Sequence, residues 1–317
     1  MTAGHVSARQ GAEDPDTAVD LPRSQTGSPP QHLLITLLAD YWFGRSEPLP
    51  SVALVELVGE FGVTPVGARA ALSRLTRRRL LATSKYGRHT YYGLTDRAAR
   101  VLEAGRRRIM SFGECSGDWD GHWTVAAFSL PEERRDLRHA LRVQLRWLGF
   151  GPLYDGMWVA PRASVGETRE MLDSLKITNA TVLRAQEPGG PAGRPLVAAW
   201  DLASLGREYR QLIASYEPMV QRIRQGQVSA AEALISRTAV MDTWRNFPAL
   251  DPDLPDELLP ADWPRRDARN VFVEVYDGLG PLAVIRVRQV LARFAPELTG
   301  HVRYLTTKDA PGPSSRP

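Results

Sequence analysis

The segment Gly62–Leu80 reads GVTPVGARAALSRLTRRRL, and it decides the fold of the N-terminal part of the chain. Thr64 and Pro65 predict the start of a helix, because threonine caps free amides and proline suits the first helical position. At 100° per residue, one side of this helix carries Ala68, Ala71, Leu72 and Leu75. The opposite side is small and basic. The helix is therefore predicted to bury one face and to present arginines on the other.

The residues around this helix extend the pattern. A helix through Leu33, Leu34, Leu37 and Leu38 is predicted first, and a second one follows from an expected N-cap at Ser51 to a stop at Gly62. After the basic helix, two strand-like runs, 80–84 and 89–94, flank a turn. This turn holds Lys85, Tyr86, Gly87 and Arg88. Helix, tight turn, helix and basic-tipped hairpin, in this order, predict a winged helix-turn-helix domain.

The exposed side of the basic helix and the hairpin tip are the predicted DNA-binding site. Small side chains let a helix approach a groove closely, and guanidinium groups can reach phosphates or pair with guanine edges. The candidate residues are Thr64, Val66, Arg69, Ser73, Arg74, Arg77, Arg78, Lys85 and Arg88.

Positive charge is concentrated in the same region. Residues 29–112 hold 13 Lys or Arg against 6 Asp or Glu, a balance of +7, whereas the whole chain carries +4. Because a local excess of positive charge is the electrostatic footprint of polyanion binding, this region is predicted to contact nucleic acid. An arginine-rich solvated surface is the alternative interpretation, since arginine dominates over lysine throughout the chain.

The middle of the chain alternates strands and helices. Strands are predicted at 123–130, 154–160, 180–185 and 196–200, and helices start at Pro131 and Val165. This βαββαβ-like order predicts a ferredoxin-like sheet with helices on one face. From Asp201 the pattern becomes helical. The Pro-rich stretch 247–264 is predicted to be an ordered loop, and a turn at 277–281 is predicted to divide the last helices.

These signals define an α+β multidomain chain. Residues 1–28 and 305–317 are predicted to be disordered tails, because they are rich in Gly, Ser and Pro without periodicity. Between the tails lie a winged-helix domain at 29–112, a ferredoxin-like domain at 119–200 and a helical C-terminal domain at 201–304. The strongest signals for loops inside the chain predict a linker around 111–121 and a long hairpin loop at 187–195.

Three segments together resemble the PaaX family of bacterial repressors of phenylacetic acid degradation. They are GVTPVGARAALSRLTRRRLL, WDGHWTVAAFSLPEERRDLRHALRVQLRWLGFGPLYDGMWVAPR and TWRNFPALDPDLPDELLPADWP, and the resemblance covers about residues 30–300. It implies a winged-helix DNA-binding domain, a central domain similar to the small ferredoxin-like endonucleases of CRISPR spacer acquisition, and a helical C-terminal domain. It also implies a homodimer that an aryl-CoA thioester, such as phenylacetyl-CoA, releases from a double-stranded DNA operator.

The resemblance locates an effector region but no individual contact. A CoA thioester needs basic groups for its phosphates and apolar or aromatic walls for its acyl part. In the C-terminal region, Arg207, Tyr209, Arg210, Trp244, Arg245 and Trp263 supply such chemistry. For each of them, an ordinary core aromatic or surface arginine is an equally good interpretation.

Enzyme signatures are missing from the sequence. A nuclease of the resembled type needs a metal-binding acid in or beside its first strand, yet 123–130 contains none, and Asp118 and Asp120 precede it. The six histidines lack zinc-ligand spacing, and we find neither a phosphate loop nor a nucleophile elbow. We therefore expect no catalytic residue, metal or cofactor. A nuclease or thioesterase tethered to DNA and a non-specific DNA-binding scaffold are the alternative functions.

The expected location is the cytoplasm. The first residues contain acids and lack the apolar segment of a secretion signal. A lone cysteine, Cys115, cannot form an internal disulfide, which fits a reducing compartment. The longest apolar runs fall far short of the roughly 20 residues that a membrane span needs.

Overall fold

The computed structural model describes residues 30–114, 119–187 and 195–309, and it combines helices with two antiparallel sheets. These residues form two compact units. One contains the described residues up to Ala104 together with Val290–His301, and the other contains Gly105–Gln289 and the residues from Val302 onward. Among the described residues, no helix has the length and apolar character needed to cross a bilayer. The predicted mixture of helix and sheet in several domains is confirmed.

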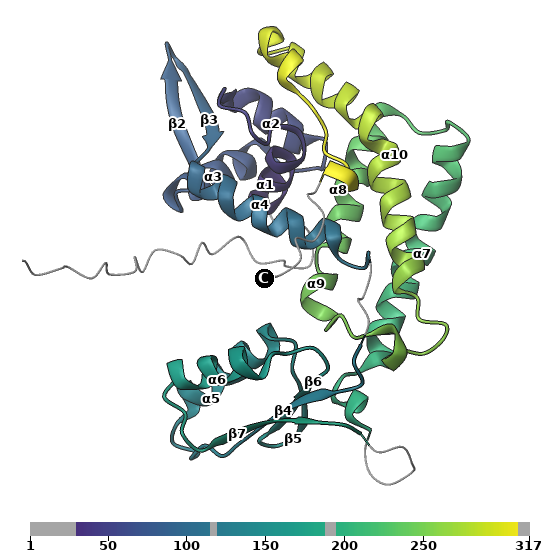
Figure 1. The fold of residues 1–317 in the computed structure, drawn as a ribbon. Coiled ribbons are helices and arrows are strands. Elements are labelled where there is room, and N and C mark those ends of the chain that lie inside the picture. Colours follow the sequence, from purple (N-terminus) through teal and green to yellow (C-terminus); the bar gives the residue numbers. More distant parts are fainter. Residues whose placement is uncertain (1–29, 115–118, 188–194, 310–317) are drawn as a thin grey trace, which may run out of the picture. The chain divides into compact units, whose positions relative to one another are not determined.

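The first unit is built from three helices, a small sheet and the start of a fourth helix (Figure 1). β3 lies in the centre of the sheet and pairs with β1 and β2, both antiparallel. The elements are α1 (Pro30–Tyr41), β1 (Leu49–Pro50), α2 (Ser51–Gly59), α3 (Pro65–Arg77), β2 (Leu81–Tyr86), β3 (His89–Leu94), α4 (Asp96–Ser111) and the 3-10 helix η3 (Pro296–His301).

The core of this unit follows the predicted helical stripes. The predicted leucines of α1 are at most 4% exposed, and they are Leu33, Leu34, Leu37 and Leu38. One detail of the prediction is wrong. Ser51 is not the N-cap of α2 but its first helical residue, and Pro50 precedes it without a side-chain cap. The N-terminal tail, 1–28, lies outside the described residues.

The central part of the second unit is a four-stranded antiparallel sheet in the order β5-β6-β4-β7. Alternate residues point to its two faces, so that Ala126 and Trp158 pack with α5 and α6 while Val125 and Val159 face the other way. Figure 1 shows both helices on the same face of the sheet. The elements are β4 (Trp123–Phe128), α5 (Arg135–Trp147), β5 (Gly151–Tyr154), β6 (Met157–Ala160), α6 (Val165–Ser174) and β7 (Ala180–Ala185).

Two predicted strands of this part are wrong. The run 154–160 is not one strand, because the chain reverses at Asp155 and Gly156 between β5 and β6. Gly156 has a φ of 75°, and a Cβ there would lie 2.5 Å from the Phe128 carbonyl oxygen, so this turn requires glycine. The run 196–200 contains a 3-10 helix, η1 (Leu196–Ala199), which covers the second face of the sheet. Its apolar residues are therefore half-buried against the sheet without joining a strand ladder.

The rest of the second unit is helical. Pro218 lies within α7, and the helix continues beyond it to Arg224. The Pro-rich stretch 247–264 contains two short helical turns, and Leu254 anchors it in the core with no exposed surface. The elements are α7 (Leu202–Arg224), α8 (Ala230–Trp244), α9 (Phe247–Leu250), η2 (Asp256–Leu258), α10 (Arg265–Ala292) and η4 (Thr307–Asp309).

The end of the chain differs most from its prediction. α10 runs through 277–281 without a turn, although it contains Gly278, Gly280 and Pro281. A Cβ on Gly280 would lie 2.3 Å from the Tyr304 ring, so this glycine admits a neighbouring side chain instead of making a turn. The predicted tail also begins too early, because Thr307 is buried and donates to Asp277. Residues 290–301 belong to the first unit and not to the predicted helical domain 201–304.

Candidate nucleic-acid interface

A short turn and a capped N-terminus hold α3 against α2. Gly62 has a φ of 77°, which lets the chain turn after α2, and its N–H donates to the carbonyl of Gly59 over 2.9 Å. The Thr64 hydroxyl accepts a hydrogen bond from the N–H of Gly67 at 3.2 Å, and Pro65 occupies the first helical position. Both predicted start signals are thus confirmed.

The two faces of α3 differ in burial as the sequence predicts. Ala68, Ala71, Leu72 and Leu75 have no exposed surface and fix the helix in the core. On the other side, Val66 is 75% exposed. The polar residues predicted for this face, Thr64, Arg69, Ser73, Arg74 and Arg77, are exposed too.

The hairpin is fastened to the end of α3 through Thr95. Arg79 has a φ of 56°, a left-handed conformation that turns the chain sharply after α3. The Thr95 hydroxyl donates to the Arg79 carbonyl over 2.9 Å and accepts from the N–H of Ala98 over 3.1 Å, where it also caps α4. One side chain therefore joins α3, the base of the hairpin and the start of α4.

The hairpin carries its predicted basic tip into solvent. Tyr86 pairs with His89 in the ladder, which leaves Gly87 and Arg88 as the two-residue turn, and Gly87 has a φ of 60°. Lys85 and Arg88 are exposed. Tyr86, which the candidate set omits, is 60% exposed and packs edge-on against Tyr91 with 5.0 Å between ring centroids.

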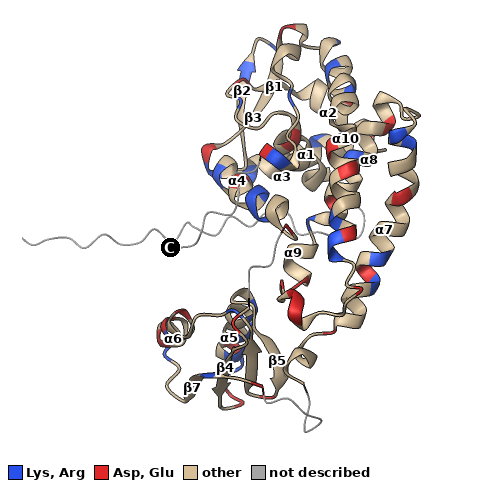
Figure 2. Ribbon diagram, turned by 45° about the vertical axis from the view of Figure 1, so that its right-hand side comes forward, with Lys and Arg blue, Asp and Glu red and all other residues tan. Residues whose placement is uncertain are grey.

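The basic groups of this surface are not neutralised. Within the described residues, Arg69, Arg74, Arg77, Lys85 and Arg88 form no ion pair with a carboxylate. Arg78 differs from the others, because it is half-buried and serves as the C-cap residue of α3. Figure 2 shows Lys and Arg along α3 and α4. The surface thus combines a protruding helix, a hairpin and uncompensated positive charge, which is the chemistry that phosphates and base edges bind.

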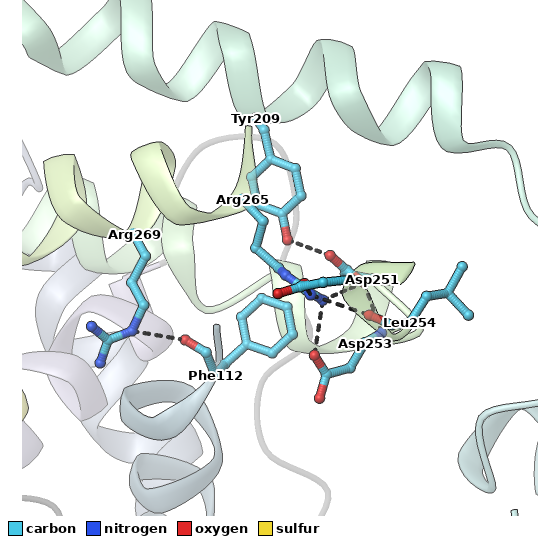
Figure 3. A network of polar contacts seen from close by, with 8 residues as sticks. Phe112, Tyr209, Asp251, Asp253, Leu254, Arg265 and Arg269 are labelled. Atoms are coloured by element: carbon cyan, nitrogen blue, oxygen red, sulfur yellow. Dashed lines mark hydrogen bonds and ion pairs between the residues drawn. The ribbon is translucent and has the colours of Figure 1, made fainter. Parts of the chain in front are cut away.

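The candidate effector residues divide into core aromatics and surface arginines. Tyr209 has no exposed surface, stacks on Phe247 with 4.3 Å between centroids, and donates to the Asp251 carboxylate over 2.6 Å (Figure 3). Burial, followed by the negative charge of Asp251, raises the pKa of the Tyr209 phenol above its ordinary value. This tyrosine is held as a neutral donor inside the fold.

A buried arginine completes this polar cluster. Arg265 is 5% exposed, and its guanidinium lies 2.8 Å from Asp253, 3.1 Å from Asp256 and 3.7 Å from Asp251 (Figure 3). Burial raises the pKa of the Asp251 carboxyl, and Arg265 opposes that effect. The cluster ties the Pro-rich stretch to α7 and α10. The sequence analysis did not identify this cluster, although its three aspartates and Arg265 all lie within 251–265 and only Tyr209 is distant in the chain.

The other two candidate aromatic residues, both tryptophans, also pack against aromatic neighbours. Trp244 has no exposed surface, stacks on Phe272 with 4.9 Å between centroids, and donates to the Ile109 carbonyl over 3.1 Å. Trp263 is half-buried and meets Tyr209 edge-on, with 6.0 Å between centroids.

The three candidate arginines have different surroundings. Arg207 is exposed, and Arg210 forms an exposed pair with Asp262 at 3.7 Å. Arg245 is mostly buried beside Asp242, at 3.1 Å, and burial lowers the pKa of its guanidinium. A Cβ on Gly206 would meet both Trp263 and Arg210 within 3.4 Å. Arg210 on α7 and Trp263 in the Pro-rich stretch therefore lie close together.

The acid before the first strand of the central sheet is engaged by protein groups. Asp120 forms an ion pair with Arg184 and accepts the N–H of His122 over 2.9 Å. The His122 N–H and the Arg184 guanidinium hold the pKa of this carboxyl below its ordinary value. In the part of the chain that the structure describes, no group of His, Cys, Asp and Glu is arranged to hold a metal ion. Asp118 lies outside the described residues.

Comparison with known proteins covers all three parts of the chain. Residues 30–98 match the family model of a PaaX-like protein, residues 116–197 that of a PaaX protein central Cas2-like domain, and residues 200–286 that of a PaaX-like protein C-terminal domain. The chain is a multidomain protein of mixed α and β structure, and it belongs to the PaaX family.

Two individual proteins resemble most of the chain. The transcriptional repressor PaaX of Escherichia coli (strain K12) is 25% identical over 264 residues, which are 81% of this chain and 82% of that protein. A solved structure of an uncharacterized protein from Mycobacterium tuberculosis superimposes with a TM-score of 0.54 and 23% identity. The superposition covers 83% of this chain and 98% of the Mycobacterium tuberculosis chain, and it shows that the two folds are similar.

Proposed function

We propose that the protein is a dimeric, sequence-specific DNA-binding transcriptional repressor that an aryl-CoA thioester resembling phenylacetyl-CoA releases from its operator. Its target genes would then serve aromatic acid catabolism. The family and the similarity to a named repressor support this function. The observation that carries it is the exposed, unpaired basic face of α3 above a fully buried apolar face.

In this proposal, the first unit is a winged helix-turn-helix. α3 is the recognition helix that enters the major groove, and the hairpin β2–β3 is the wing that contacts the phosphate backbone. The two recognition helices of a dimer bind half-sites that are about 34 Å apart or a multiple of that distance. Val66 and Ser73 are the small residues that let α3 approach the bases.

The central sheet is a ferredoxin-like domain that acts without catalysis. Its element order, βαββαβ with strand order β5-β6-β4-β7, supports the fold. The engagement of Asp120 by Arg184 supports the lack of metal chemistry, because Mg²⁺ needs carboxylates that converge on the ion. The proposed effector site lies in the helical part, and the proximity of Arg210 and Tyr209 to Trp263 supports it.

Binding to DNA from upstream of the protein's own gene and its neighbours tests this proposal. The affinity is measured at fixed salt, with and without a panel of aryl-CoA thioesters, because salt alone changes protein–DNA affinity strongly. We expect specific binding that one thioester weakens. Specific binding that no thioester alters would reject the effector, and equal binding to all sequences would favour a non-specific scaffold. Turnover of DNA or thioester would indicate an enzyme.

A further inference from the structure

α5 of the central domain has a strongly basic face that the recognition helix does not account for. Residues 119–187 contain 9 Lys or Arg and 9 Asp or Glu, so this part of the chain is neutral overall. The charges are nevertheless segregated. α5 holds four arginines and one acid, whereas α6 holds three acids and one arginine. A merely arginine-rich composition would not separate the two signs between neighbouring helices.

The four arginines lie along one side of α5. Leu141 and Leu145 have no exposed surface and direct the helix toward the sheet. The arginines follow each other at intervals of three, four and four residues, so they fall on one flank of the helix beside these leucines. They are Arg135, Arg138, Arg142 and Arg146. Arg138 lies nearest to the leucines and is half-buried, whereas the other three are exposed.

Few acceptors inside the protein compete for these guanidinium groups. Arg138 donates to the Leu130 carbonyl over 2.8 Å, and Arg146 lies over the Trp158 ring at 5.8 Å. In the described part of the chain, their one ion pair joins Arg142 to Asp155 at 3.7 Å, and the Asp155 side chain is 94% exposed. Exposed pairs of this kind contribute little, so the positive charge of the face is available to a partner.

We propose that this face of α5 binds the phosphate backbone of double-stranded DNA, in addition to the contacts of α3 and the hairpin. The inference rests on the proposed function, since a chain that binds an operator brings its other surfaces near the flanking duplex. From Arg135 to Arg146 the helix rises about 16 Å, a length of duplex that carries about ten phosphate charges. A row of guanidiniums suits phosphates, which accept charged hydrogen bonds without carrying sequence information.

The full-length protein with Arg135→Gln and Arg142→Gln tests this proposal. Both side chains are exposed, so the double variant is expected to keep the wild-type melting temperature. Binding to a long duplex of random sequence and to one that carries the operator is measured over a range of salt concentrations. We expect the slope of log K against log salt to become shallower by about 1.8, since each lost phosphate contact removes about 0.9.

The matched control removes the same charge from the neighbouring helix region. Arg169→Gln with Lys176→Gln also takes two exposed positive charges from this domain. A control slope like that of the wild type, together with a shallower slope for the α5 variant, supports the proposal. Equal slopes for the two variants overturn it, and so does a change of oligomeric state in the α5 variant alone, which would assign the face to a protein contact.

The same data separate this proposal from the proposed function. The ratio of the operator affinity to the random-sequence affinity reports on the recognition helix α3. The salt slope on random sequence reports on α5. A wild-type ratio near one with a slope that depends on α5 rejects the repressor but keeps the α5 contact. Absence of duplex binding by the wild type rejects both.

Discussion

Arg77 lies on the exposed face in the last turn of α3, and Arg88 lies in the turn of the hairpin. If Arg77 reads a base edge, Arg77→Ala lowers the preference for the operator over other DNA by about 1–3 kcal/mol. Arg88→Ala lowers the affinity for all sequences alike and makes the salt slope shallower by about 0.9. Titrations with operator and random duplexes measure both effects. An equal loss on every sequence for Arg77→Ala would make it a phosphate contact.

Tyr209 stabilises the fold, and we expect this contribution to be lost at alkaline pH. Its pKa is raised in the folded protein, so the unfolded chain releases this proton first as the pH passes 10. The stability due to the neutral phenol is therefore complete below that pH and falls above it, by about 1.4 kcal/mol per pH unit. Tyr209→Phe lacks this dependence.

We expect Tyr209→Phe to be less stable than the wild type at pH 8, by about 1–3 kcal/mol, because Asp251 loses a buried donor. The difference should shrink above pH 10. Denaturant titrations at pH 8, 10 and 11 measure it. A constant difference across this range would mean that Tyr209 ionises in the folded state as easily as in the unfolded one.

Among the helices, α10 depends on a glycine for packing and not for flexibility. A Cβ at Gly280 would lie 2.3–3.1 Å from three atoms of the Tyr304 ring, so Gly280→Ala must displace this ring. We expect a loss of about 1–3 kcal/mol, as for other overpacked sites. Gly105→Ala in α4 is the control, because its Cβ meets nothing within 4 Å and alanine favours a helix by about 1 kcal/mol. If thermal unfolding shows both variants stabilised, Tyr304 is not fixed on α10.

The elements that the sequence predicts well are those with local signals. Thr64 and Pro65 begin α3 within a few residues of its buried stripe, so its start, its burial and its exposed arginines follow from spacing alone. Gly280 and Pro281 carry local signals for a turn, yet α10 continues through both, and Gly280 leaves room for the Tyr304 ring instead. The hydrogen bond from Tyr209 to Asp251 likewise joins two elements that are 42 residues apart in the chain, and no local pattern reveals their proximity.

For the molecule as a whole, the stretch after Val302 closes the second unit. Arg237 has no exposed surface, lies 3.8 Å from the centroid of the Tyr276 ring, and donates to the carbonyls of Tyr276 and Leu305. Thr307 donates its N–H and its hydroxyl to Asp277, over 2.9 and 2.7 Å. The buried Arg237 guanidinium and the Asp277 carboxylate are thus hydrogen-bonded by Leu305 and Thr307, which the sequence assigns to a disordered tail.

Two truncations test the weight of these contacts. In a chain that ends at His301, Arg237 loses its hydrogen bond to the Leu305 carbonyl and Asp277 loses Thr307. Breaking such buried polar contacts costs about 3–5 kcal/mol. A chain that ends at Asp309 keeps all the contacts described for this stretch, so we expect it to unfold like the full chain. Calorimetric melting of the two variants beside the full chain measures the difference. Equal melting temperatures for all three would show that α8 and α10 hold Arg237 without the end of the chain, whereas a loss confined to the shorter chain makes residues 302–309 part of the folded core.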